Sequence, residues 1–115
     1  MRKTMSTNIY MRRLIHALKK QGAPLWREVA EYLSRPRRKR IQVNLSRINR
    51  YSGDGDIVVV PGKVLGSGVL SKKVTVVAWR FSEEAYKKIQ SVGRAVLLEE
   101  FLQTKPESKN IKIIT

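Results

Sequence analysis

The sequence predicts an α/β fold, a single compact domain of layered short strands and helices with a basic, helical N-terminal extension. Two observations predict this irregular strand–helix repeat. Apolar residues follow a helical period in the first third of the chain, and strand-like and helix-like patterns alternate from residue 41 onward. Residues 1–53 hold 14 basic and 2 acidic side chains, whereas residues 54–115 hold 10 and 7. We therefore expect one continuous unit with two parts: a basic N-terminal part (1–53), with two helices and an arm, and an α/β core (54–115).

Two amphipathic helices are predicted in the first third of the chain. In the first helix the apolar positions repeat at intervals of three and four; they are Met11, Leu14, Ile15 and Leu18. Thr7 or Asn8 is the expected cap, and Gly22 closes the helix. The second helix begins at Pro24 and ends before Pro36. Its apolar face consists of Trp26, Val29, Ala30 and Leu33.

Extended segments follow the helices. Residues alternate between apolar and polar over Ile41–Leu45, which predicts a half-buried strand or extended segment. Ile57–Val60 predicts a short buried strand that Pro61-Gly62 stops, and a glycine-rich bend at 66–68 comes next. Because Val74–Phe81 is apolar on both faces, we expect it to be the central strand of the core.

The last third of the chain predicts two helices and a strand. Ser82 is a suitable N-cap, and Phe81 can pack against Tyr86 across the first turn of its helix. A further helix is expected to begin near Ala95, with an apolar face of Leu97, Leu98, Phe101 and Leu102. Ile111–Ile114 predicts a brief closing strand.

Composition excludes several classes of function. The chain has no cysteine, and His16 is its single histidine, so we expect no metal centre, no disulfide and no cofactor. No apolar run has the length of a membrane span, and no secretory signal is recognisable, which predicts a cytoplasmic protein without a membrane partner. A small-molecule substrate and catalytic residues are not expected either, because no nucleophile, metal cluster or facing pair of carboxylates emerges.

The net charge of +15 predicts a polyanionic partner. Nucleic acid is favoured over an anionic membrane because the densest basic run, at 35–40, has no apolar face beside it. Taken alone, this run could be a solvated linker. It leads, however, into amide, hydroxyl and guanidinium donors between residues 42 and 50, which suit phosphate, sugar and base edges. The predicted RNA-binding residues are Arg12, Arg13, Arg35, Arg37, Arg38, Lys39, Arg40, Asn44, Arg47, Arg50, Lys63, Lys72 and Lys73.

Three other motifs receive structural interpretations. The residues from Pro61 to Gly68 lack the Walker A spacing and predict a structural loop rather than a nucleotide site. Asp54 and Asp56 flank a glycine as in a calcium loop, but the position that needs a glutamate is Leu65, so a turn is the better interpretation. The two tryptophans, at 26 and 79, are expected to anchor the core rather than to stack on bases.

Several segments of the sequence resemble those of a known protein family. The stretch VPGKVLGSGVLSKKVTV (60–76), followed by Phe81-Ser82 and AYKKI (85–89), resembles the archaeal and eukaryotic "eighteen-e" family of large-subunit ribosomal proteins. More distantly it is similar to the universal "fifteen" family. Asn8-x-Tyr10 and the basic run leading into VNLSRI (43–48) resemble the eighteen-e family specifically, so the resemblance covers residues 8–115.

The resemblance implies a non-enzymatic role in which the protein binds and stabilises large-subunit ribosomal RNA of the 23S type, next to neighbouring large-subunit proteins. The family's Gly-Gly after the helix that begins at Phe-Ser is Gly93-Arg94 here, which adds a cation. Its late Asn-Pro-Lys-Gly turn is Lys105-Pro106-Glu107-Ser108, which removes one. The alternative function is that of a free-standing RNA- or DNA-binding protein.

Overall fold

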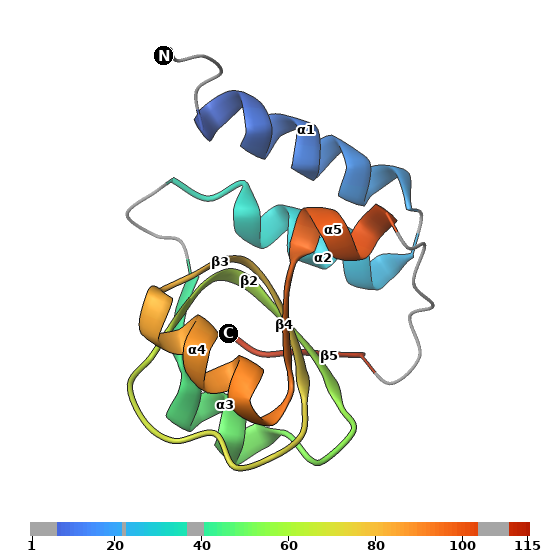
Figure 1. Cartoon of the computed structure of the whole chain (residues 1–115). Helices are drawn as coiled ribbons and strands as arrows, with labels where there is room; N and C mark the ends of the chain where they lie inside the picture. Colours follow the sequence, from blue (N-terminus) through green and yellow to red (C-terminus); the bar gives the residue numbers. More distant parts are fainter. Residues whose placement is uncertain (1–6, 22, 37–40, 104–110) are drawn as a thin grey trace.

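The computed structural model describes residues 7–21, 23–36, 41–103 and 111–115, with side chains from Tyr10 onward. Within these residues, five parallel strands form one sheet with helices on both faces, so the expected α/β class is confirmed (Figure 1). The helices are α1 (Thr7–Lys20), α2 (Pro24–Leu33), α3 (Leu45–Tyr51), α4 (Glu83–Val92) and α5 (Leu98–Gln103). The strands are β1 (Ile41–Asn44), β2 (Ile57–Leu65), β3 (Thr75–Phe81), β4 (Arg94–Leu97) and β5 (Ile111–Ile113).

The sheet is built around β2 and β3. Strand β3 lies between β2 and β4, which confirms its expected central position. On the other edge of β2, β5 pairs with residues 57–59 and β1 pairs with residues 62–65. Strands β1 and β5, which are far apart in the sequence, therefore lie end to end along one neighbour.

Both faces of the sheet are buried, as the continuous apolar sequence of β3 requires. Helices α1, α2 and α5 cover one face, where Trp26, Leu18 and Leu98 pack against Val59 and Val77. Helices α3 and α4 cover the opposite face (Figure 1). The side chains of Leu45, Ile48, Val58, Val76 and Ile89 form the core there. The first two helices thus share a core with the strands. The division of the chain into a basic part (1–53) and an α/β core (54–115) rests on the distribution of charge and stays a prediction.

Both tryptophans are core residues. Trp26 is 1% exposed and Trp79 is 7% exposed, so they anchor the core that faces α1 and α2.

The start of α4 also has the expected local structure. The hydroxyl of Ser82 accepts a hydrogen bond from the backbone N–H of Ala85 at 3.1 Å. The rings of Phe81 and Tyr86 meet nearly edge to face, with their centroids 6.2 Å apart.

The expectation that Pro61-Gly62 stops the second strand is wrong, because β2 continues to Leu65. Val60 pairs with Ala78 and Lys63 with Arg80, so Pro61 and Gly62 together stand opposite Trp79. This is a β-bulge, and a bulge accommodates proline because the extra residue is left out of the ladder. A Cβ on Gly62 would overlap the carbonyl oxygen of Ile41, so the glycine allows β1 to approach.

Two further expectations need correction. The extended segment ends at Asn44, and residues 45–51 form helix α3, whose buried Leu45 and Ile48 are spaced three apart. Residues 94–97 are strand β4, paired with β3, and the helix expected from Ala95 begins at Leu98. In both cases a few apolar residues fit a helix and a strand equally well, and pairing with a neighbour decides between them.

Several sequence features fall outside the described residues. The expected caps at Thr7 and Asn8 belong to side chains that are not described. Gly22, the basic residues 37–40 and the turn at 105–108 are also outside the described residues.

Candidate nucleic-acid interface

The exposed face of α1 is cationic. Burial of Met11, Leu14 and Leu18 against the core turns the remaining side chains of this helix toward solvent. Arg12 and Arg13 are exposed, and so are Lys19 and Lys20 in the last turn. Since no Asp or Glu occurs between residues 7 and 20, this face has no acidic side chain of its own helix beside its cations. His16 is exposed on the same helix.

The basic arm joins α2 to β1. Arg35 follows α2 and is exposed, and its guanidinium carbon lies 4.7 Å from the ring centroid of Tyr32. Arg37, Arg38, Lys39 and Arg40 lie outside the described residues. Asn44 ends β1 as the N-cap residue of α3, and its exposed side chain makes no capping hydrogen bond. This amide has no hydrogen-bond partner among the residues that the structure describes.

Helix α3 brings Arg47 and Arg50 together around one tyrosine. Their guanidinium carbons lie 5.2 and 5.6 Å from the ring centroid of Tyr51, within the range of cation–π attraction. The Nε of Arg47 donates a hydrogen bond to the main-chain oxygen of Thr115 at 2.8 Å. Tyr51 and Arg47 line a hollow of about 450 Å³ with residues 112–115. Sequence reasoning missed Tyr51, although its spacing from Arg47 would have indicated the pair if the helix had been recognised.

Lys63 belongs to a row of polar side chains across three strands. The sheet register pairs Gln42 of β1 with Lys63 of β2, and Lys63 with Arg80 of β3. All three side chains are exposed. Arg80 Nη1 lies 3.4 Å from Glu99 Oε1, and its guanidinium stacks on Trp79. The sequence did not indicate Arg80 as a site residue, because the row is created by strand register and not by spacing along the chain.

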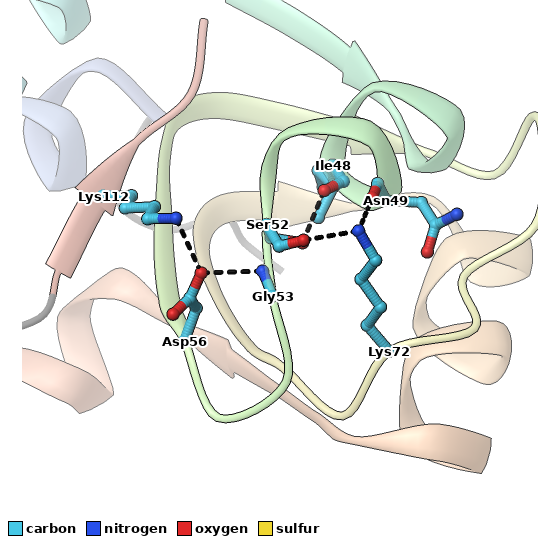
Figure 2. A network of polar contacts seen from close by, with 7 residues as sticks. All are labelled: Ile48, Asn49, Ser52, Gly53, Asp56, Lys72 and Lys112. Atoms are coloured by element: carbon cyan, nitrogen blue, oxygen red, sulfur yellow. Dashed lines mark hydrogen bonds and ion pairs between the residues drawn. The ribbon is translucent and has the colours of Figure 1, made fainter.

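Lys72 and Lys73 are adjacent but differ in environment. The ammonium of Lys72 donates hydrogen bonds of 2.6 Å to the carbonyl oxygens of Asn49 and Ser52, at the end of α3. A cation is favourable there because the last carbonyls of a helix carry partial negative charge. Figure 2 shows the Lys72 side chain reaching into this turn. Lys73 is exposed, and its backbone N–H donates to Asp54 Oδ1 at 2.8 Å.

The glycine-rich loop is held by side chains. Lys88 Nζ donates to the carbonyl oxygens of Gly66 and Gly68, at 2.9 and 3.2 Å. Gly68 has a φ of +99°, and a Cβ there would collide with Ser46. This loop differs from a phosphate-binding loop in two respects. Its carbonyl oxygens accept hydrogen bonds from a cation, whereas a phosphate-binding loop turns backbone N–H groups toward an anion. The element that follows it is strand β3 and not a helix.

Asp56 fastens β5 to the turn before β2. Its Oδ2 accepts a hydrogen bond from the backbone N–H of Gly53 at 2.7 Å and lies 2.9 Å from Lys112 Nζ (Figure 2). The pKa of Asp56 lies below its usual value, mainly because of the hydrogen bond from Lys112 and to a smaller extent because of the bond from Gly53. This carboxyl therefore stays charged. The aspartate therefore serves a structural ion pair, as expected for a turn.

Within the described ranges, no three His, Cys, Asp or Glu side chains are grouped so that they could hold a metal ion. None of the described helices is both long and apolar enough to cross a membrane.

Known proteins resemble this chain along most of its length. A family model for ribosomal proteins, described as covering 50S-L15 and 50S-L18e together with a 60S protein, matches residues 37–97. The large ribosomal subunit protein eL18 of Methanococcus maripaludis is 43% identical over 119 residues, with 99% of both chains covered. For eL18 of Sulfurisphaera tokodaii, the identity is 47% over 113 residues, or 97% of this chain and 96% of the relative. For eL18 of Sulfolobus acidocaldarius, it is 55% over 92 residues, or 80% of this chain and 78% of the relative.

These matches agree with the resemblance carried by the segments 60–76 and 85–89. The family model spans the arm, the bulged strand, the glycine-rich loop and the capped helix, and the relatives extend the match to the N-terminal helices. The chain therefore belongs to the ribosomal protein family that includes 50S-L15 and 50S-L18e.

Proposed function

We propose that this protein is a structural constituent of the large ribosomal subunit, and that it binds and stabilises large-subunit ribosomal RNA through its basic N-terminal half. The observation that carries the proposal is the exposed face of α1, which presents Arg12, Arg13, Lys19 and Lys20 without an acidic residue in the helix. The names of the eL18 relatives point to the same subunit.

The physical basis is the attraction of cations to RNA phosphates. Each neutralised phosphate releases condensed counterions, so binding depends steeply on salt. Arginine is well suited to this task, because its planar guanidinium donates two parallel hydrogen bonds to one phosphate. The arm at 35–40 and the donors of Asn44, Arg47 and Arg50 extend the contact. The sequence predicts a second contact from Lys63, Lys72 and Lys73. We assign it to Lys63 and Lys73, because the Lys72 ammonium already donates to the carbonyl oxygens of Asn49 and Ser52.

The proposed role is binding and not catalysis. The cationic side chains hold RNA segments in their folded arrangement, while the two-sided core keeps those side chains in fixed relative positions. Proteins of the large subunit that lie next to this RNA are the expected neighbours.

The test compares two exposed cations in living cells. Arg12→Gln removes a cation from α1, and Lys87→Gln removes one from α4, where Lys87 is 74% exposed and lies 3.4 Å from Glu83. We expect wild type and K87Q to cosediment with large subunits through a high-salt gradient, and R12Q to be lost from them at lower salt. In binding to an rRNA fragment, R12Q should reduce the slope of log K against log salt by about 0.7–0.9.

The RNA partner is identified by crosslinking in cells and sequencing of the attached RNA. Crosslinks concentrated at one locus of large-subunit rRNA support the proposal. Crosslinks scattered over many RNAs or DNA, with no cosedimentation, would favour the alternative of a free-standing nucleic-acid-binding protein. Equal behaviour of R12Q and K87Q would contradict the assignment of α1 as a contact surface.

A further inference from the structure

A hollow between α3 and β5 combines an exposed aromatic ring with two cations. Its volume is about 450 Å³, and its lining includes Arg47, Tyr51 and Lys112 with residues 113–115. Arg50 is not part of this lining, but its guanidinium carbon lies 5.6 Å from the Tyr51 ring centroid. Helix α3, which contributes Arg47 and Tyr51, and helix α1 lie over opposite faces of the sheet (Figure 1).

Tyr51 combines exposure with two close cationic neighbours. The residue is 51% exposed even though two guanidinium groups approach the ring. Within the fold, the ring therefore gains cation–π contacts while about half of the residue's surface stays exposed. An aromatic ring beside arginine planes is the surface on which unpaired bases stack in RNA-binding proteins, because every base presents a π face.

The cations around the ring are held in place before any ligand binds. Arg47 uses Nε for the bond of 2.8 Å to Thr115, and its four remaining N–H donors have no hydrogen-bond partner among the described residues. Lys112, which also lines the hollow, is paired with Asp56 at 2.9 Å. A guanidinium that is already oriented loses less conformational entropy when it binds a phosphate.

Charge and shape together select the ligand. Among the side chains at the hollow, Lys112 is paired with Asp56, whereas Arg47 in the lining and Arg50 beside the ring have no carboxylate side chain as a partner among the described residues. Two guanidinium groups next to one ring suit a phosphate. A paired base inside an RNA duplex is stacked on both faces and cannot reach the Tyr51 ring. An unpaired nucleotide offers both a phosphate and a free base.

We infer that the α3–β5 hollow binds a single unpaired RNA nucleotide, whose base lies against Tyr51 and whose phosphate is bound by Arg47. The inference rests on the proposed function and adds to it a second RNA site on the other side of the sheet from α1. One protein then contacts two RNA segments, a duplex or loop at α1 and an extruded nucleotide at α3.

The test uses two fluorescein-labelled RNA hairpins with the full-length protein. One hairpin carries a bulge of three adenosines, and the other carries three abasic nucleotides at the same place, so that the phosphates are identical. We expect wild type to bind the adenosine bulge about tenfold more tightly, within the range of about 5- to 150-fold that base stacking gives. Tyr51→Phe should keep this preference, and Tyr51→Ser should abolish it.

Tyr86→Ser is the matched control, because Tyr86 is 46% exposed on α4 and lies outside the hollow. It should leave the preference for adenosine unchanged. Equal binding of the two hairpins by wild type would overturn the nucleotide site while leaving the proposed function intact, and so would a preference that survives in Y51S. Binding of neither hairpin at low salt would overturn both proposals. Displacement of the adenosine bulge by an oligoglutamate peptide at equal concentration would assign the hollow to an acidic protein and overturn the inference.

Discussion

At the scale of single residues, Gly62 is a position that leaves no room for a side chain. The bulge at Pro61-Gly62 places it directly against β1, and a Cβ would overlap the carbonyl oxygen of Ile41. The carbonyl group of Ile41 belongs to the backbone of β1, so it cannot move without breaking the pairing between β1 and β2. The conformational freedom of glycine is not the reason here, because the restriction is one of space.

We predict that Gly62→Ala lowers the free energy of unfolding by about 3 kcal/mol or more, since overpacking against backbone costs at least as much as overpacking in a core. Gly55→Ala is the control. Gly55 has a φ of +86°, and a Cβ added there would meet nothing within 4 Å, so only backbone strain of about 1 kcal/mol is expected. Urea unfolding of both variants measures the difference, and equal losses would show that β1 yields to the new methyl group.

At the scale of elements, α3 is held by its neighbours. The helix has seven residues, which is too short to be stable alone, and side chains from the loop before β3 support it. Asn49 Oδ1 accepts hydrogen bonds from the backbone N–H and hydroxyl of Ser71, at 3.0 and 3.2 Å. Lys72 binds the final carbonyls, and the buried Ser52 hydroxyl donates to the carbonyl of Ile48 at 2.6 Å (Figure 2). This loop therefore positions Arg47, Arg50 and Tyr51.

The adjacent lysines Lys72 and Lys73 allow the structural and RNA-binding roles to be separated. Lys72→Met removes the cation at the end of α3, and we expect a loss of about 1.5–3 kcal/mol in stability, the range for hydrogen bonds to charged groups. The salt slope of RNA binding should stay unchanged in this variant. Lys73→Met should leave the melting temperature unchanged and reduce the slope by about 0.7–0.9. Calorimetry and a salt titration measure the two quantities, and a reversed pattern would make Lys72 the phosphate contact.

At the scale of the whole molecule, cations lie on both sides of one rigid sheet. Helix α1 lies over one face of the sheet and α3 over the other (Figure 1), and the α3–β5 hollow is lined from the side of α3. The molecule spans 36 × 33 × 25 Å, so an RNA duplex at one surface does not occupy the other without wrapping around the protein. The basic run at 37–40 connects the helices of the first side to β1 in sequence.

We predict that replacing Arg37, Arg38, Lys39 and Arg40 by Ala weakens RNA binding strongly at low salt and reduces the salt slope by about 3. The melting temperature should stay nearly unchanged, because charged side chains at a surface contribute little to stability. The control replaces the three arginines by lysine, which keeps the charge and therefore most of the slope. Collapse of the fold in the alanine variant would contradict the view that this run serves binding.

The sequence alone predicted the features that depend on neighbouring residues in the chain. The stripes of α1 and α2, the Ser82 cap, the apolar faces of β3 and the cationic surface of Arg12 and Arg13 all follow from local period or composition. These features are recognisable because a helix cap or an amphipathic stripe is specified within one or two turns. Family membership was likewise visible in the motifs between residues 60 and 89.

Tertiary structure alone decided the features that depend on distant partners. Strand β2 passes through Pro61-Gly62 because β1 and β3 pair with it on both edges. Residues 94–97 are a strand because β3 supplies a ladder, and Lys72 turns inward because the carbonyls of α3 lie beside it. Short segments have no strong preference of their own, so long-range hydrogen bonds and packing determine their conformation. The same packing brings Tyr51 and Lys112 to one hollow, which no spacing in the sequence could have indicated.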